Sequence, residues 1–185
     1  MRWDGLFADL EAQAAALHSA ERGAEIEERT RAEAGRLTLL DRLRPAVGAT
    51  VRVRSRGGVS IAGDVRQVGS EWVLLDEGAG REALVVLSAV TSIAGLGRLS
   101  AVPDTMGVVQ LRLGLRHALR GIARDRSPLR LHLVDETVLD GTLDRVGADF
   151  IEFALHAPGE SRRRAEVREV LVVALPAVAV LRRDG

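Results

Sequence analysis

An internal repeat appears when VRVRSRGGVSIAGDVRQVGSEWV (residues 51–73) is placed without a gap on LRLHLVDETVLDGTLDRVGADFI (residues 129–151). The match extends to both sides. RLTLLDRLR (36–44) matches RLGLRHALR (112–120), and LSAVTSI (87–93) matches LPAVAVL (175–181). The offset changes only between these segments, where loops absorb insertions. We therefore expect two copies of one unit, which consists of a short helix, a set of alternating strands and a final apolar strand.

Within each unit apolar residues alternate with polar ones, as in strands that have one buried face. Val51 and Val53 point to one face, which we expect to be core, and the opposite face carries Arg52, Arg54 and Arg56. Gly63 and Gly141 occupy the same place in the second strand of each unit. A glycine within a strand usually marks a bend, a bulge or a close backbone approach. We therefore expect each unit to wrap five short strands into a small barrel.

The pattern around these glycines resembles that of the Sm-like family of small SH3-like barrels. It is apolar-x-Gly-x-apolar-x-x-apolar, and it occurs as IAGDVRQV at 61–68 and as LDGTLDRV at 139–146. The resemblance covers about residues 36–183 and implies barrels that associate through their edge strands. The family's RNA site uses an Asp directly after this pattern and an Asn soon after it. This chain has Gly69 and Gly147 at the first place and contains no Asn, so the resemblance implies the fold and not the RNA pocket.

The opening MRWDGLFADLEAQ, together with RLGL, DRVGADF and HAPGE, is also similar to an uncharacterised family of high-GC Gram-positive bacteria. Some members of that family carry an automatic label as Fis-type regulators. Such a label implies a C-terminal helix-turn-helix. The C-terminal sequence of this chain predicts strands instead.

We accordingly predict a mainly β protein with helices (α+β), divided into three parts. Residues 1–33 form an N-terminal amphipathic helical segment, residues 34–97 a first five-stranded Sm-like barrel, and residues 98–185 a second barrel with a longer hairpin between its third and fourth strands. Each barrel follows a short helix. The N-terminal segment carries an apolar stripe at Trp3, Leu6, Leu10 and Leu17. A lone helix of this length is only marginally stable without packing, so we expect the stripe to contact the barrels, another copy or a partner.

The composition excludes several chemistries. Basic and acidic residues both number 26, and every basic residue is Arg. The absence of Lys excludes a P-loop lysine and Schiff-base catalysis, and the absence of Cys excludes thiol catalysis, disulfides and thiolate zinc sites. The early acidic residues do not fit a signal peptide, and the apolar run 171–181 is too short for a membrane helix. We expect a bacterial cytoplasmic protein.

Catalytic motifs are weak throughout the sequence. LDGTLD (139–144) is similar to a phosphatase nucleophile motif, but Val138 stands at the nucleophile position. GAGREA (78–83) fits a dinucleotide fingerprint, but a strand rather than a helix is predicted after it. The four His residues lack metal-ligand spacing and are predicted to lie on the surface, His132 on the face that corresponds to Arg54. The sequence therefore predicts no catalytic, cofactor-binding or metal-binding residue and no small-molecule substrate.

Two arginine groups remain as candidate anion or nucleic-acid contacts: Arg52, Arg54 and Arg56 on one strand, and Arg162, Arg163 and Arg164 in the long hairpin. The zero net charge and the few aromatic residues argue against nucleic acid as the main ligand. We therefore predict a non-enzymatic interaction or scaffold protein that binds a protein partner or itself. The first alternative is an RNA- or DNA-binding regulator that uses the arginines, and the second is an enzyme with an unrecognised site.

Overall fold

The computed structural model describes residues 11, 13, 18, 19, 22, 23, 25, 27–97, 99, 114–156 and 169–183. The chain divides into two compact units, Met1–Thr38 and Leu39–Gly185. In the first unit residues 27–34 are helical and exposed. The predicted interaction stripe of Trp3, Leu6, Leu10 and Leu17 lies outside the described residues.

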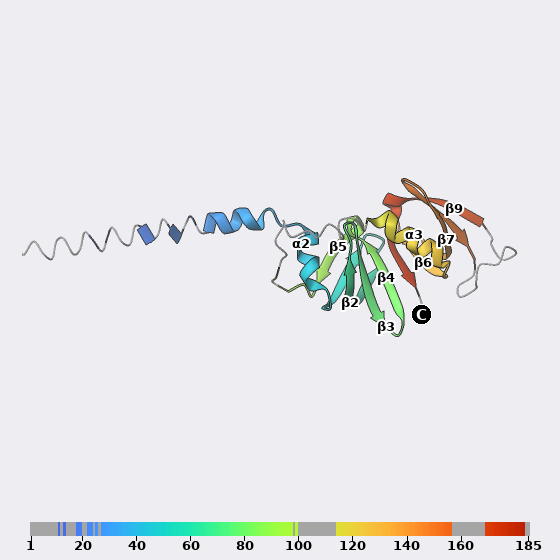
Figure 1. Cartoon of the computed structure of the whole chain (residues 1–185), viewed down its shortest axis with the longest axis horizontal. Coiled ribbons are helices and arrows are strands. Elements are labelled where there is room, and N and C mark those ends of the chain that lie inside the picture. Colours follow the sequence, from blue (N-terminus) through green and yellow to red (C-terminus); the bar gives the residue numbers. More distant parts are fainter. Residues whose placement is uncertain are drawn as a thin grey trace, which may run out of the picture. The chain divides into compact units, whose positions relative to one another are not determined.

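The second unit consists mainly of strands (Figure 1). Its helices are α2 (Leu39–Leu43) and α3 (Leu115–Asp125), with 3-10 turns η1 (Arg44–Ala46), η2 (Leu87–Ala89) and η4 (Leu175–Ala177). The strands of the first repeat are β1 (Thr50–Ser55), β2 (Ser60–Val68), β3 (Trp72–Gly78), β4 (Arg81–Val86) and β5 (Val90–Ala94). Those of the second repeat are β6 (Leu129–Leu133), β7 (Val138–Val146), β8 (Phe150–Leu155), β9 (Glu169–Ala174) and β10 (Val178–Arg183).

All ten strands belong to one antiparallel sheet with the order β5-β1-β2-β3-β4-β10-β6-β7-β8-β9. The prediction of two separate five-stranded barrels is therefore wrong. The reason is the pairing of β4, whose free edge bonds to β10 of the second repeat and not to a strand of its own repeat. Backbone N–H and C=O groups at a strand edge need partners, and here the two repeats supply them to each other.

The two repeats still use the same strand register. Val51 pairs with Gly63 in β1–β2, and Leu129 pairs with Gly141 in β6–β7. A Cβ at Gly63 would lie 2.3 Å from the carbonyl oxygen of Asp76, and a Cβ at Gly141 would lie 2.1 Å from the corresponding oxygen of Ala154. Only glycine allows this approach, so a close backbone contact, one of the three interpretations that the sequence left open, is present in both repeats.

The core runs across the boundary between the repeats. Val85 of β4 lies in the first repeat's core and pairs with Val180 of β10, and both side chains are fully buried. Val180 pairs in turn with His132 of β6. Paired residues of an antiparallel sheet share a face, so the inner face of the first repeat continues onto the outer face of β6. The β1–β2 turn lies against this region, since a Cβ at Gly57 would be 2.2 Å from the carbonyl oxygen of Leu133.

Candidate functional site

The two repeats join along β4 and β10, a junction held by more than backbone hydrogen bonds. Arg182 of β10 donates from Nε to Oε1 of Glu77, next to β4, at 2.6 Å. The Glu77 side chain is only 7% exposed, so this ion pair is largely shielded from water. Because a shielded ion pair is geometrically demanding, this pair adds a side-chain contact to the backbone pairing between the repeats.

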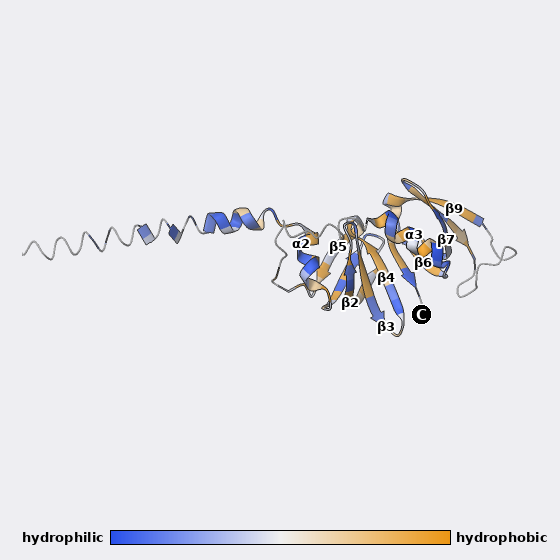
Figure 2. Cartoon of the chain, viewed as in Figure 1, coloured by the Kyte–Doolittle hydropathy of each residue, from blue (hydrophilic) through white to orange (hydrophobic). Residues whose placement is uncertain are grey.

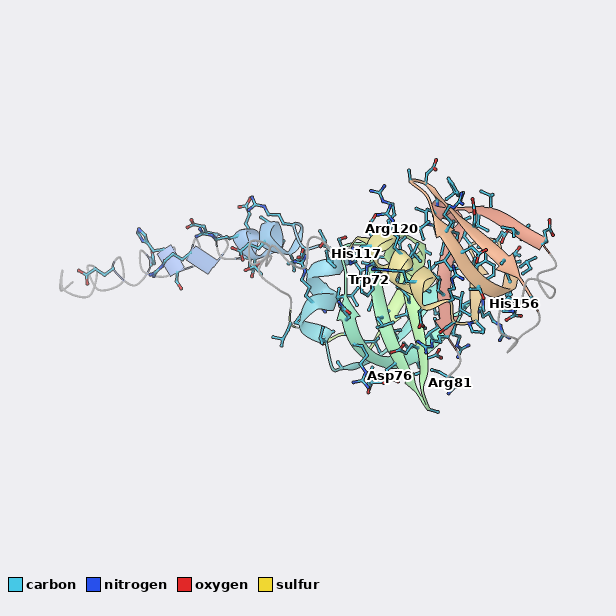
Figure 3. The ribbon with its side chains drawn as sticks, turned by 45° about the vertical axis from the view of Figure 1, so that its right-hand side comes forward. Trp72, Asp76, Arg81, His117, Arg120 and His156 are labelled. Atoms are coloured by element: carbon cyan, nitrogen blue, oxygen red, sulfur yellow. The ribbon has the colours of Figure 1, made fainter. Side chains whose placement is uncertain are left out.

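Helix α3 covers the junction on one face. The backbone N–H of Leu115, in the first turn of α3, donates to Oε2 of Glu71 at 3.0 Å. A carboxylate at this place satisfies a helix N–H and interacts favourably with the helix dipole. Below α3, Trp72 of β3 and Leu84 of β4 are 4% and 5% exposed. Figure 3 shows Trp72 beside the helix that carries His117 and Arg120. Helix α3, near the start of the second repeat, thus covers the outer face of β3 and β4 in the first repeat.

A partly open cavity of about 290 Å³ remains beneath α3. Its floor is apolar and comes from β3, β4 and β10, including Leu74, Leu84 and Leu181. Its rim carries the ion pair between Arg183 and Asp125, whose closest atoms are 3.3 Å apart. The cavity is a packing space between the repeats and presents no converging set of reactive groups.

The sheet ends at β9, which is the counterpart of β4 in the second repeat. Val172 and Val170 of β9 are 68% and 48% exposed, and Figure 2 shows this edge strand as mainly hydrophobic. Phe150, the counterpart of Trp72, is only partly buried, and Asp149, the counterpart of Glu71, is exposed. The second repeat therefore presents, uncovered, the same set of groups that the first repeat has covered.

The other end of the sheet is β5, which pairs only with β1 among the described residues. At the start of the first repeat, α2 occupies the place that α3 occupies in the second. Leu39 of α2 is 41% exposed, whereas its counterpart Leu115 in α3 is 7% exposed. Within the described part of the chain, the two ends of the sheet are thus unlike, and each is without the neighbour that its counterpart has at the internal junction.

The predicted arginine face on β1 is present. Arg52, Arg54 and Arg56 are exposed, but Arg56 donates to the carbonyl oxygen of Ser88. Arg52 lies between Ala62 and Ala94 on the adjacent strands, and the closest neighbours of Arg54 are two serines. Among the described residues no carboxylate pairs with Arg52 or Arg54. The group Arg162, Arg163 and Arg164 lies outside the described residues.

The prediction that the histidines lie on the surface is wrong for His132 and His156, which are 9% and 4% exposed. The Nε2 atom of His156 lies 2.6 Å from the hydroxyl of buried Thr142. Among the residues that the structure describes, neither ring nitrogen of His132 has a hydrogen-bond partner. Burial and the neighbouring Arg130 and Arg182 lower the pKa of His132. Strand alternation within one repeat could not reveal this burial, because the first repeat covers the outer face of β6.

The structure has a second basic surface that was not predicted from the sequence. A groove of about 640 Å³ runs between α3 and β7 and is lined by Arg120, Ala123, Arg124, Arg126, Asp144, Arg145 and Val146. We call it the α3–β7 groove. The available signal was the spacing of Arg116, Arg120 and Arg124, which places all three on one side of a helix. The arginine that completes the groove comes from a strand distant in sequence.

Within the described part of the chain, no cluster of three His, Asp or Glu side chains is arranged to hold a metal ion. Its helices are also too short or too polar to cross a membrane. The sequence matches no protein-family model and no curated protein.

Proposed function

We propose that this chain is a non-enzymatic cytoplasmic assembly module whose copies join head to tail, with β9 of one copy pairing with β5 of the next. The observation that carries the proposal is the contrast between Leu84, 5% exposed at the internal junction, and Val172, 68% exposed at the same place in the second repeat. A long apolar edge strand is a template for pairing with another chain.

The internal junction supplies the geometry of the proposed joint. Leu84 of β4 pairs with Leu181 of β10, and Val85 pairs with Val180. The equivalent pairing between copies sets Val172 opposite Ile93 and Val173 opposite Ser92 of the next copy. This antiparallel addition satisfies the free backbone groups of both edge strands and buries the exposed valine side chain.

Helix α2 of the next copy takes the role of α3 in such a joint. It covers Phe150 as α3 covers Trp72, and the carboxylate of Asp149 accepts from the N–H of Leu39 as Glu71 accepts from that of Leu115. The internal junction thus has three separate features: a strand edge, an aromatic residue and a carboxylate at a helix start. Each of them has an uncovered counterpart in the second repeat. Such a joint is heterologous, so the copies form a ring if the rotation closes and a filament if it does not.

The test is the mass of the full-length chain in solution, measured by sedimentation and light scattering over a range of concentrations. We expect the native chain to self-associate and Val172→Asp to sediment as a monomer, because a buried charge opposes edge pairing. Val138→Asp is the matched control, since Val138 is 49% exposed but lies on β7, away from the sheet edges. A native chain that stays monomeric at all concentrations contradicts the proposal.

A mixing experiment separates this joint from a symmetric one. Val172→Asp blocks the β9 end and leaves β5 and α2 intact, whereas Leu39→Asp blocks the α2 end and leaves β9 intact. Each variant alone is expected to be monomeric, and the two together are expected to form a one-to-one dimer. If pairs form through β9 on both copies, Leu39→Asp alone still dimerises and does not pair with Val172→Asp, and the head-to-tail arrangement is wrong.

A further inference from the structure

We propose that the α3–β7 groove binds the phosphate backbone of duplex nucleic acid, independently of its sequence. The groove is lined by four arginines, Arg120, Arg124, Arg126 and Arg145, and by a single carboxylate, Asp144. Every basic residue of this chain is Arg, so the residue type alone does not distinguish this groove from the rest of the surface. The groove is distinguished by having four of these side chains in its lining.

The arginines on α3 form a row and not a cluster. Arg116, Arg120 and Arg124 follow one another at four-residue steps, which corresponds to about 6 Å per step along a helix. Arg116 begins the row beside the carbonyl oxygen of Ala148, and the Nε of Arg124 donates to the carbonyl oxygen of Arg120. A row of cations suits a ligand that presents charges at regular intervals, as a nucleic-acid strand does at about 3.4 Å per phosphate.

Among the described residues, no carboxylate forms an ion pair with Arg120, Arg124 or Arg126. Arg145 pairs with Glu152, and their closest atoms are 3.3 Å apart. Arginine near the end of a helix also stabilises the helix dipole, which accounts for Arg124 and Arg126. It does not account for Arg145, which β7 brings to the opposite wall and which is 72% exposed.

The first repeat does not build this groove, although it has the same elements. The counterpart of Arg120 is Arg44, which is 18% exposed and pairs with Asp41 at 3.3 Å. The counterpart of Arg145 is Gln67. A basic groove is therefore not a by-product of the shared fold, and its charges are specific to the second repeat.

Duplex rather than single-stranded nucleic acid follows from what the groove lacks. Its lining contains no aromatic side chain, and proteins that hold single strands generally stack bases on aromatic rings. A groove with guanidinium groups and no aromatic ring is suited to contacting phosphates. Such phosphate contacts position a duplex without reading its sequence.

The experiment measures the affinity of the full-length chain for a fluorescent DNA duplex at salt concentrations from about 50 to about 200 mM. Across this range, each phosphate contact is expected to make the affinity fall by a further factor of about 3.5. Arg120→Gln with Arg124→Gln is the test variant. We expect it to flatten the salt dependence by about two contacts, or roughly tenfold over this range. Arg36→Gln with Arg81→Gln removes equal charge from two exposed positions outside the groove and is the matched control, expected to bind as the native chain does.

Three outcomes overturn the proposal. The first is the absence of salt-sensitive duplex binding by the native chain. The second is an equal loss in the two double variants, which indicates net charge and not the groove. The third is tighter binding to a poly-glutamate peptide than to the duplex, which assigns the groove to an acidic protein segment. Unfolding curves and oligomeric masses that match those of the native chain show that the test variant changes the groove alone.

Discussion

The covered edge β4 and the open edge β9 are the same element of the repeat in two different surroundings. At β4, Leu84 is nearly inaccessible to solvent because β10 and α3 lie against it. At β9, Val172 stands two-thirds exposed. Both strands are apolar and pair with the third strand of their repeat, and among the described residues only β4 has a further strand on its other side. The internal junction thus shows what the open edge lacks.

The largest loss of stability is expected at the mid-strand glycines, Gly63 and Gly141, where the two repeats are constrained in the same way. Gly141→Ala places a Cβ 2.1 Å from a backbone oxygen, and Gly63→Ala places one at 2.3 Å, so the backbone must move in both. We expect each to lower the free energy of unfolding by at least about 3 kcal/mol, as for severe overpacking. Urea unfolding monitored by circular dichroism measures this.

Gly121→Ala is the control for those glycine variants. Gly121 lies within α3, and a Cβ there meets no atom within 4 Å. Replacing a helical glycine by alanine stabilises by about 0.5–1 kcal/mol, so this variant is expected to gain stability. A similar small change in all three variants means that the close backbone approach does not constrain the repeats.

The next largest effect is a difference in stability between variants at the covered edge β4 and at the open edge β9. Leu84→Ala removes a buried side chain and is expected to lower the free energy of unfolding by about 2–3 kcal/mol. Val172→Ala removes an exposed one and is expected to change it by less than about 0.5 kcal/mol at concentrations where the chain is monomeric. Calorimetry at low protein concentration gives both values. A large loss in the valine variant at that concentration indicates that a neighbour already covers β9.

A smaller effect concerns the carboxylates at the helix starts. Glu71→Ala leaves the N–H of Leu115 without its acceptor and is expected to cost about 1 kcal/mol in stability. Asp149→Ala is expected to leave the stability of the monomer unchanged and to weaken self-association. The two effects are measured by thermal unfolding and by sedimentation. Loss of monomer stability in the aspartate variant contradicts the idea that this cap is supplied only by another copy.

The smallest effect is a pH dependence present in the second repeat alone, because His132 occupies the place of Arg54. Burial lowers the pKa of His132 in the folded protein, while the unfolded chain takes up a proton near pH 6.5. Stability from this residue is therefore present above about pH 6.5 and falls as the pH drops below that value. His132→Gln is expected to remove this component of the stability difference between about pH 7 and pH 5. An unchanged pH dependence in the variant means that another group is responsible.

The β1–β2 and β6–β7 strand pairs could be predicted from local patterns, whereas the joining of all ten strands into one sheet could not. Alternation around Val51 and Leu129, together with the glycines at 63 and 141, predicts the β1–β2 and β6–β7 pairs, because side-chain periodicity and close approach are local properties. The same patterns predict separate barrels equally well. A strand edge carries no mark of its partner, since backbone N–H and C=O groups are identical in every residue but proline.

The candidate sites divide in the same way. The sequence alone determined that Arg52 and Arg54 share an exposed strand face, because neighbours in one strand are placed by its period of two. Only the tertiary structure decided that His132 is buried, that Leu84 is covered while Val172 is open, and that Arg145 joins the arginines of α3 in one groove. Each of these depends on which distant segments pack together, and packing is settled by the shape and burial of the whole sheet.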